Sequence, residues 1–231
     1  MRAILQRGER AGRRHRYGLV LFATAILAVF SLVVPDTGPD RVLAFLGAAA
    51  TLLIGVATSE APARTRRAVA VALAAMVVVG AITALFAEPE PAGVLGAAAL
   101  LSGATIGVIS GGLFRLIVER GVVVQAVLGA LAVYLLIGLT FAFVIGALAE
   151  GLHAPYFAQG GDIEQSRRTY FSFTVLTTTG FGDLTPAEGI GRLLAVLEML
   201  LGQLYLVTVI SLLVGNLGRR RGQDRERPPR R

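Results

Sequence analysis

Six long apolar stretches constrain what this chain can fold into more than any other feature of its sequence. A helix needs about 20 apolar residues, at about 1.5 Å each, to cross a hydrocarbon core of about 30 Å. The stretches that reach or approach this length are Tyr17–Val34, Val42–Thr58, Ala68–Ala87, Ala92–Phe114, Val122–Ala149 and Ile190–Leu217. The sequence therefore predicts an all-α integral membrane protein with six transmembrane helices.

The composition agrees with a membrane setting. Of the 231 residues, 55% are hydrophobic and 16% are charged, whereas soluble domains have about 45–50% apolar and about 25% charged residues. The absence of cysteine excludes a disulfide framework, a Cys-based metal site and thiol catalysis. The net charge of +7 comes from arginines gathered at the ends of the apolar stretches. This placement favours a lipid bilayer as partner and argues against nucleic-acid binding.

The arginine distribution also predicts the orientation in the membrane. Residues 1–16 and the tail after the last stretch are rich in arginine, and so are the connections at 64–67 and 115–120. The intervening connections at 35–41 and 88–91 hold one arginine and none. Because basic connections stay on the cytoplasmic side, both termini are expected in the cytoplasm of a multi-pass plasma-membrane protein. The first apolar stretch is long for a signal peptide and no clear cleavage site follows it, so it is expected to be retained.

Two connections near the C-terminal half need separate interpretation. Only residues 115–121 separate the fourth and fifth stretches; the charges beside Gly121 favour a tight turn over a single bent helical pair.

About forty residues separate the fifth and sixth stretches, and loops of this length are usually functional. Within this loop Thr169–Thr179 is apolar, but as a helix it would cover only about 15 Å. It is therefore expected to be a re-entrant helix, surrounded by protein or by a water-filled cavity.

The segment that follows this short helix reads Thr-Thr-Thr-Gly-Phe-Gly-Asp from Thr177 to Asp183. It resembles the selectivity signature of the potassium-channel pore family, commonly TTVGYGD, and the resemblance extends over about residues 122–217. It implies a pore domain at 119–217 with an outer helix, turret, pore helix, selectivity filter and inner helix. The remaining chain would comprise a basic N-terminus (1–16), a four-helix membrane domain (17–118) and a short basic cytoplasmic tail (218–231).

The resemblance implies an ion path made of backbone oxygens. The carbonyls of Thr178, Thr179, Gly180 and Phe181 would hold K⁺, and the Thr178 hydroxyl would add the innermost ring of oxygens. Gly182 completes the filter. A permeant cation must exchange its water shell for oxygens of similar field strength. A strand that points successive carbonyls to one axis needs unusual dihedrals, and glycine reaches positive φ at little cost.

Other residues are expected to support the filter. By the resemblance, Asp183 braces its outer end, with Thr174 and Tyr170 as polar neighbours and Thr177 at its base. The alternative is that Asp183 is a solvated turn residue.

Two positions depart from the family pattern. Thr179 stands where valine is common and adds a polar group behind the filter. Phe181 stands where tyrosine is common and lacks the hydroxyl that braces the filter. Because the path uses backbone oxygens, potassium selectivity is expected to survive both changes.

The predicted outer side carries more acids than bases, which would raise the local cation concentration. Its acids are Glu150, Asp162, Glu164 and Glu188, and its bases are Arg167 and Arg168.

Three features of the spans have structural and functional interpretations. Gly202 lies twenty positions after Gly182, where the family often has a gating hinge; close helix packing is the equal alternative. Glu198 is an acid at membrane depth and marks a candidate functional contact, with Arg192 as a poor partner. Glycines 103, 107 and 111 form a stripe that predicts helix packing.

Together these features predict passive, potassium-selective conduction by a homotetramer, because one filter strand cannot encircle an ion. The alternatives are a non-selective monovalent cation channel and, from another class, a secondary transporter. The sequence has no Walker, HExxH or GxSxG motif, so neither enzymatic activity nor a cofactor is expected. The fourth stretch also lacks the periodic arginines of voltage-gated relatives, so usual voltage gating is not expected.

Overall fold

The computed structural model describes most of the chain as helices. The described residues are 17–33, 38–58, 67, 71, 91–120, 124–152, 155–160, 164–187 and 189–225. The helices are α2 (Tyr17–Val33), α3 (Gly38–Thr58), α5 (Pro91–Arg120), α6 (Val124–Leu152), α7 (Gln165–Leu176) and α8 (Gly189–Arg225). All-helical architecture is therefore confirmed for this part of the chain.

Among the described residues, three helical segments are long and apolar enough to cross a membrane. They are Gly93–Val118 in α5, Val124–Gly151 in α6 and Gly189–Val209 in α8. Shorter apolar helices occupy Tyr17–Val33 and Leu46–Thr58, where the first two spans are predicted. The predicted third span at 68–87 lies outside the described residues, apart from Val71. The long apolar helices identify the chain as a membrane protein, whereas the full set of six spans remains a prediction.

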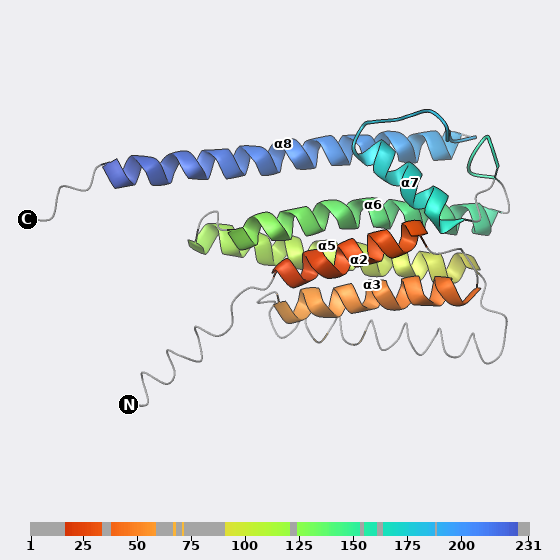
Figure 1. Ribbon diagram of the computed structural model, residues 1–231, viewed down its shortest axis with the longest axis horizontal. Helices are drawn as coiled ribbons and strands as arrows, with labels where there is room; N and C mark the ends of the chain where they lie inside the picture. Colours follow the sequence, from red (N-terminus) through yellow and green to blue (C-terminus); the bar gives the residue numbers. More distant parts are fainter. Residues whose placement is uncertain are drawn as a thin grey trace, which may run out of the picture.

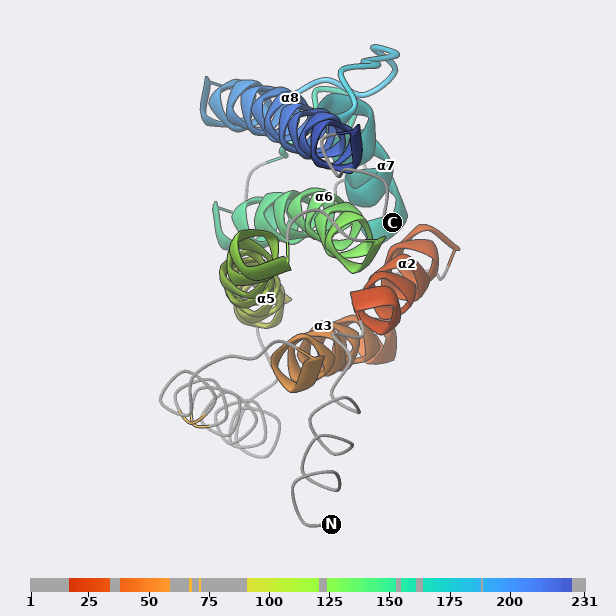
Figure 2. The same cartoon turned by 90° about the vertical axis from the view of Figure 1, so that its left-hand side faces the viewer.

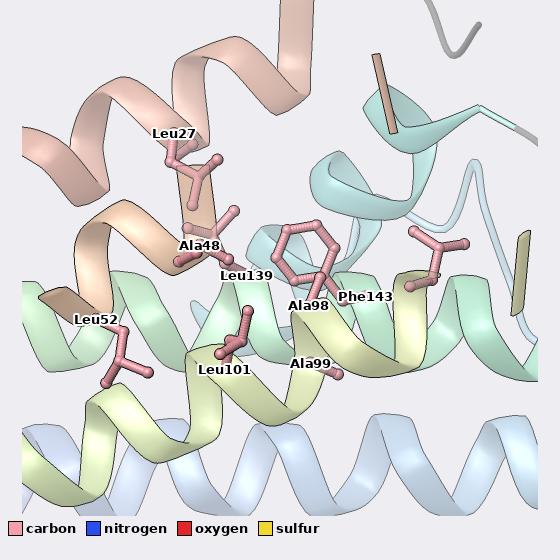
Figure 3. Close-up of a cluster of buried hydrophobic side chains, with 11 residues drawn as sticks. Leu27, Ala48, Leu52, Ala98, Ala99, Leu101, Leu139 and Phe143 are labelled. Atoms are coloured by element: carbon pink, nitrogen blue, oxygen red, sulfur yellow. The ribbon is translucent and has the colours of Figure 1, made fainter. Parts of the chain in front are cut away.

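Helices α2, α3 and α5 lie on one side of α6 and form a four-helix bundle with it. Figures 1 and 2 show α2, α3 and α5 running beside one another, with α6 between this group and α8. Apolar side chains from all four bundle helices meet in one buried cluster (Figure 3). The labelled members of this cluster are Leu27, Ala48, Leu52, Ala98, Ala99, Leu101, Leu139 and Phe143.

The boundary between the fourth and fifth predicted spans is a reversal of the chain. Helix α5 ends at Arg120 and α6 begins at Val124, and the two helices pack side by side (Figure 2). The tight turn is therefore confirmed and the bent helical pair is wrong.

The glycine stripe of α5 has no neighbour among the described residues, so its role in helix packing stays a prediction. A Cβ placed on Gly103, Gly107 or Gly111 would have no described atom within 4 Å. Within the described residues this stripe is thus an open face, because α5 meets α3 and α6 through its other sides.

Helix α7 is short and inclined to its neighbours. It has 12 residues, about 18 Å of helix, and lies against both α6 and α8 (Figure 1). It begins four residues before the predicted Thr169 and ends at Leu176 instead of Thr179. The three β-branched threonines from Thr177 onward leave the helix, which frees them for the segment that carries the motif.

Candidate functional site

In the predicted filter, residues 178–182, the backbone angle φ alternates in sign from residue to residue. Thr178, Gly180 and Gly182 have φ values of 57°, 52° and 80°, whereas Thr179 and Phe181 have negative φ. Positive φ suits glycine, as predicted for Gly180 and Gly182, but is a genuine outlier for a β-branched threonine. Alternation of positive and negative φ can turn neighbouring peptide units to one side of the chain. All five residues are exposed.

The amide groups at the start of the predicted filter turn toward α7. The N–H groups of Thr179 and Gly180 donate to the Thr174 carbonyl, with N···O distances of 2.8 and 3.2 Å, and that of Thr178 donates to Val175 at 2.9 Å. In a trans peptide, N–H and C=O point in opposite directions. The carbonyls of Thr178 and Thr179 therefore point away from α7, toward the exposed side.

Thr174 thus contacts the predicted filter through its backbone carbonyl. Its own hydroxyl donates to the Phe171 carbonyl within α7, at 2.8 Å. Every residue type carries such a carbonyl, and support of a filter by Thr174 stays a prediction.

The hydroxyl of Thr179, at the position where valine is common, is hydrogen-bonded. It lies 2.9 Å from the Thr177 hydroxyl, which gives its own proton to the Phe173 carbonyl at 2.7 Å. Since a hydroxyl has one proton, Thr179 is the donor of the pair. The polar group that this departure adds is therefore held by Thr177, behind the strand.

The hydroxyl of Thr178 faces the inner end of the predicted filter. It accepts a hydrogen bond from Nε2 of Gln203 on α8, at 3.2 Å. A hydroxyl oxygen has two lone pairs, so one remains available after this bond. Gln203 ties α8 to the innermost threonine of the predicted filter.

At the outer end, Tyr170 of α7 supports two residues of the motif. Its ring stacks on Phe181, with centroids 6.4 Å apart and ring planes at 3°. Burial and a hydrogen bond to the Asp183 carboxylate raise the pKa of the Tyr170 hydroxyl. These contacts favour a bracing role for Asp183 over a solvated turn.

A short antiparallel bridge holds the chain that leaves the motif. Phe157 pairs with Pro186; the Ala158 N–H donates to Thr185 and the Ala187 N–H to Tyr156, at 2.9 and 2.8 Å. Sequence analysis missed this bridge, because it joins two irregular segments about thirty positions apart.

An aromatic cluster anchors the bridge to α7. The rings of Tyr156, Phe157 and Phe171 meet edge to face, with centroids 5.1–6.0 Å apart. The Tyr156 hydroxyl donates to the Gly191 carbonyl of α8 at 3.1 Å, and burial raises its pKa. The cluster thereby joins the bridge, α7 and α8.

Gly202 sits where α8 passes the end of α7. A Cβ at this position would lie 2.5 Å from the Leu176 carbonyl oxygen, closer than real contacts allow. The same carbonyl accepts a hydrogen bond from Tyr134 of α6 at 3.2 Å. Helix α8 continues through Gly202 without interruption, so the packing interpretation accounts for this glycine here, and the hinge remains a prediction.

Glu198 is fully buried against α7. Its Oε1 is hydrogen-bonded to Ser172 Oγ, and the same Oγ donates to the Gly138 carbonyl of α6 at 2.6 Å. The weak pairing considered with Arg192 is not formed, because Arg192 is exposed.

Arg168 differs from its predicted place on the charged outer side. Its side chain is fully buried and donates from Nη2 to Gln165 Oε1 at 3.0 Å. The guanidinium lies over Gly146 of α6, where a Cβ would come within 2.9 Å of its Nε. The absence of a side chain at Gly146 gives the arginine its space, a relation that no local pattern reveals.

The site therefore includes residues that the sequence did not single out, namely Gly138, Ser172, Tyr134 and Tyr156. One signal pointed to two of them. Polar side chains inside apolar helices, such as Tyr134 and Ser172, are expected to find hydrogen-bond partners.

Part of the chain is similar to a known protein family. Residues 127–218 match the family model described as "Ion channel", a range that runs from α6 to α8 and contains the whole motif. No curated protein and no solved structure matches the chain.

Proposed function

We propose that the ion-channel domain of this chain conducts potassium passively across the plasma membrane, through a pore formed by four copies. The observation that carries the proposal is the backbone of residues 178–182. Positive φ alternates with negative φ there, and the N–H groups of Thr179 and Gly180 are engaged with α7. Carbonyl oxygens are then left for the exposed side, and they are the groups that replace the hydration shell of K⁺.

The proposed ion path uses the carbonyls of Thr178, Thr179, Gly180 and Phe181. Only backbone oxygens and the Thr178 hydroxyl line it, so the departures at Thr179 and Phe181 leave its chemistry unchanged. The contacts behind the strand support this. Thr179 is bonded to Thr177, and Phe181 is stacked on Tyr170.

A face of α8 supports assembly of four copies. One strand cannot surround an ion, so the path needs a symmetric oligomer. Exposed apolar residues of α8 alternate at spacings of four and three residues, which places them on one helix face. They are Leu193, Leu197, Leu200, Leu204 and Val207, with 43–64% of each residue exposed. This face is the proposed contact with neighbouring copies.

Reconstituted protein is expected to carry potassium in preference to sodium. In planar bilayers with unequal potassium on the two sides, the reversal potential should follow the potassium gradient. Ba²⁺ should block the current, because it is close to K⁺ in size but carries twice the charge and is held longer by carbonyl oxygens.

The double variant Thr179→Val, Phe181→Tyr provides the comparison, since it carries the residues common in the resembling family. Equal sodium and potassium permeability of the natural chain, with selectivity in the double variant, would instead favour the non-selective cation channel. A flux that saturates at transporter rates would contradict a pore altogether.

The proposed channel is expected to open with little dependence on voltage. All charged residues of α5 lie in its last six positions, from Arg115 to Arg120. If Arg115 crossed half the field in each of four copies, about two charges would move, whereas steep gating needs about a dozen. A conductance–voltage curve in symmetrical potassium should therefore give fewer than about four gating charges. A steeper curve would mean that another segment senses voltage.

A further inference from the structure

Glu198 and Ser172 form a three-helix junction that the ion path does not use. Glu198 lies within the apolar segment Gly189–Val209 of α8 and its side chain is fully buried. Its Oε1 meets Ser172 Oγ of α7, and this Oγ also meets the Gly138 carbonyl of α6 at 2.6 Å. Among the described residues, Oε2 has no hydrogen-bond partner.

The two contacts of Ser172 Oγ at this junction require two protons. A serine hydroxyl carries one proton, yet Ser172 Oγ contacts two oxygens that would both be acceptors if Glu198 were ionised. A backbone carbonyl cannot donate, so the second proton must come from the carboxyl group. A protonated Glu198 satisfies every contact: it donates to Ser172 Oγ, and Ser172 donates to Gly138.

Among the described residues, no cation contacts the Glu198 carboxyl group, whose hydrogen-bond partner is Ser172. The titratable groups that face Glu198 from neighbouring elements are Tyr134 of α6 and Tyr156 of the 155–160 segment. The cations of α7 are Arg167 and Arg168, of which Arg168 lies one turn before Ser172 and is directed to Gln165 and Gly146. Gly146 is eight residues, about 12 Å, along α6 from Gly138. An unpaired carboxylate at membrane depth is costly, whereas one unpartnered carbonyl oxygen of a neutral acid costs far less.

We propose that Glu198 is a protonated acid that positions the predicted filter through the relay Glu198–Ser172–Gly138. The relay joins α8 to α7 and α6 two residues before Thr174, whose carbonyl holds the N–H groups of Thr179 and Gly180. A shift of α7 would therefore move both amides. Glu198 is thus a positioning residue for ion selectivity. This positioning role rests on the proposed function, whereas the protonation of Glu198 does not.

Infrared spectroscopy tests the relay without reference to conduction. The full chain in lipid vesicles at neutral pH should show the carbonyl stretch of a protonated carboxyl group, which Glu198→Gln should remove. Glu164→Gln, which changes an exposed carboxyl, should leave the band intact. Ser172→Ala should move the band to higher frequency, because the acid loses its acceptor. The absence of the band, or a band unmoved in Ser172→Ala, would overturn the relay.

Selectivity measurements test the positioning role. Glu198→Gln keeps a donor for Ser172, so the potassium-to-sodium permeability ratio should stay within about twofold. Glu198→Leu and Ser172→Ala break the relay and should lower the ratio about tenfold. Loss of selectivity in Glu198→Gln, or full selectivity in Glu198→Leu, would overturn this role. If Glu198→Leu fails to assemble, the permeability ratio of Ser172→Ala tests the positioning role by itself. If the natural chain carries no potassium current, the proposed function is wrong, and the infrared measurement still tests the relay.

Discussion

Replacement of Gly180 by alanine is expected to abolish potassium current. Gly180 has φ of +52°, and a Cβ at this position would meet no described atom within 4 Å. Within the described residues of one copy, the penalty is therefore conformational and not steric. The left-handed region costs an L-residue about 1–2 kcal/mol, or roughly 4–8 kcal/mol for four copies. The strand should relax away from this conformation and the carbonyls should leave the path. Single-channel recording of the reconstituted variant measures the loss.

Two matched changes separate backbone conformation from side-chain bulk. D-Alanine at position 180, introduced by chemical synthesis, adds the same methyl group but favours positive φ, so it should preserve conduction. Gly103→Ala adds a methyl group at an open position of α5 and should leave the current unchanged. Normal current in Gly180→Ala would show that the motif does not form the ion path.

Gly202→Ala is expected to destabilise the contact between α8 and α7. The new Cβ would lie 2.5 Å from the Leu176 carbonyl oxygen and 2.9 Å from its Cδ1. A backbone oxygen cannot rotate away, so the helices must separate. Overpacking of this kind costs about 1–3 kcal/mol. The bond between Gln203 and Thr178 should weaken as well, because the next residue of α8 makes it. A lower denaturation temperature of the purified oligomer, together with reduced current, is the expected result.

Gly189→Ala is the control on the same helix, because a Cβ there would have no described atom within 4 Å. It should leave stability and current unchanged. If Gly202→Ala kept full stability but altered the open probability, the hinge interpretation of Gly202 would be favoured over the packing interpretation.

Features that depend on local properties could be predicted from the sequence. Apolar length predicted the helices that α5, α6 and α8 now form, because hydropathy is a sum over consecutive residues. Positive φ at Gly180 and Gly182 was expected because glycine alone adopts it at little cost. Thr178 was not expected to share this conformation, since a β-branched side chain opposes it. Hydrogen bonds of its neighbours to α7 hold the strand there.

Features that depend on which segments meet were decided only by the tertiary structure. Arg168 looks like an exposed charge in the sequence, yet it is buried because Gly146, on another helix, leaves room for it. Gly202 had two equal interpretations until the Leu176 carbonyl was found beside it. Glu198 had no role until Ser172 and Gly138 were placed around it. The sequence determined which residues prefer the membrane and positive φ, because both preferences act within one short segment. Partners 22 to 60 positions apart were decided by helix packing, because such contacts leave no periodic pattern along the chain.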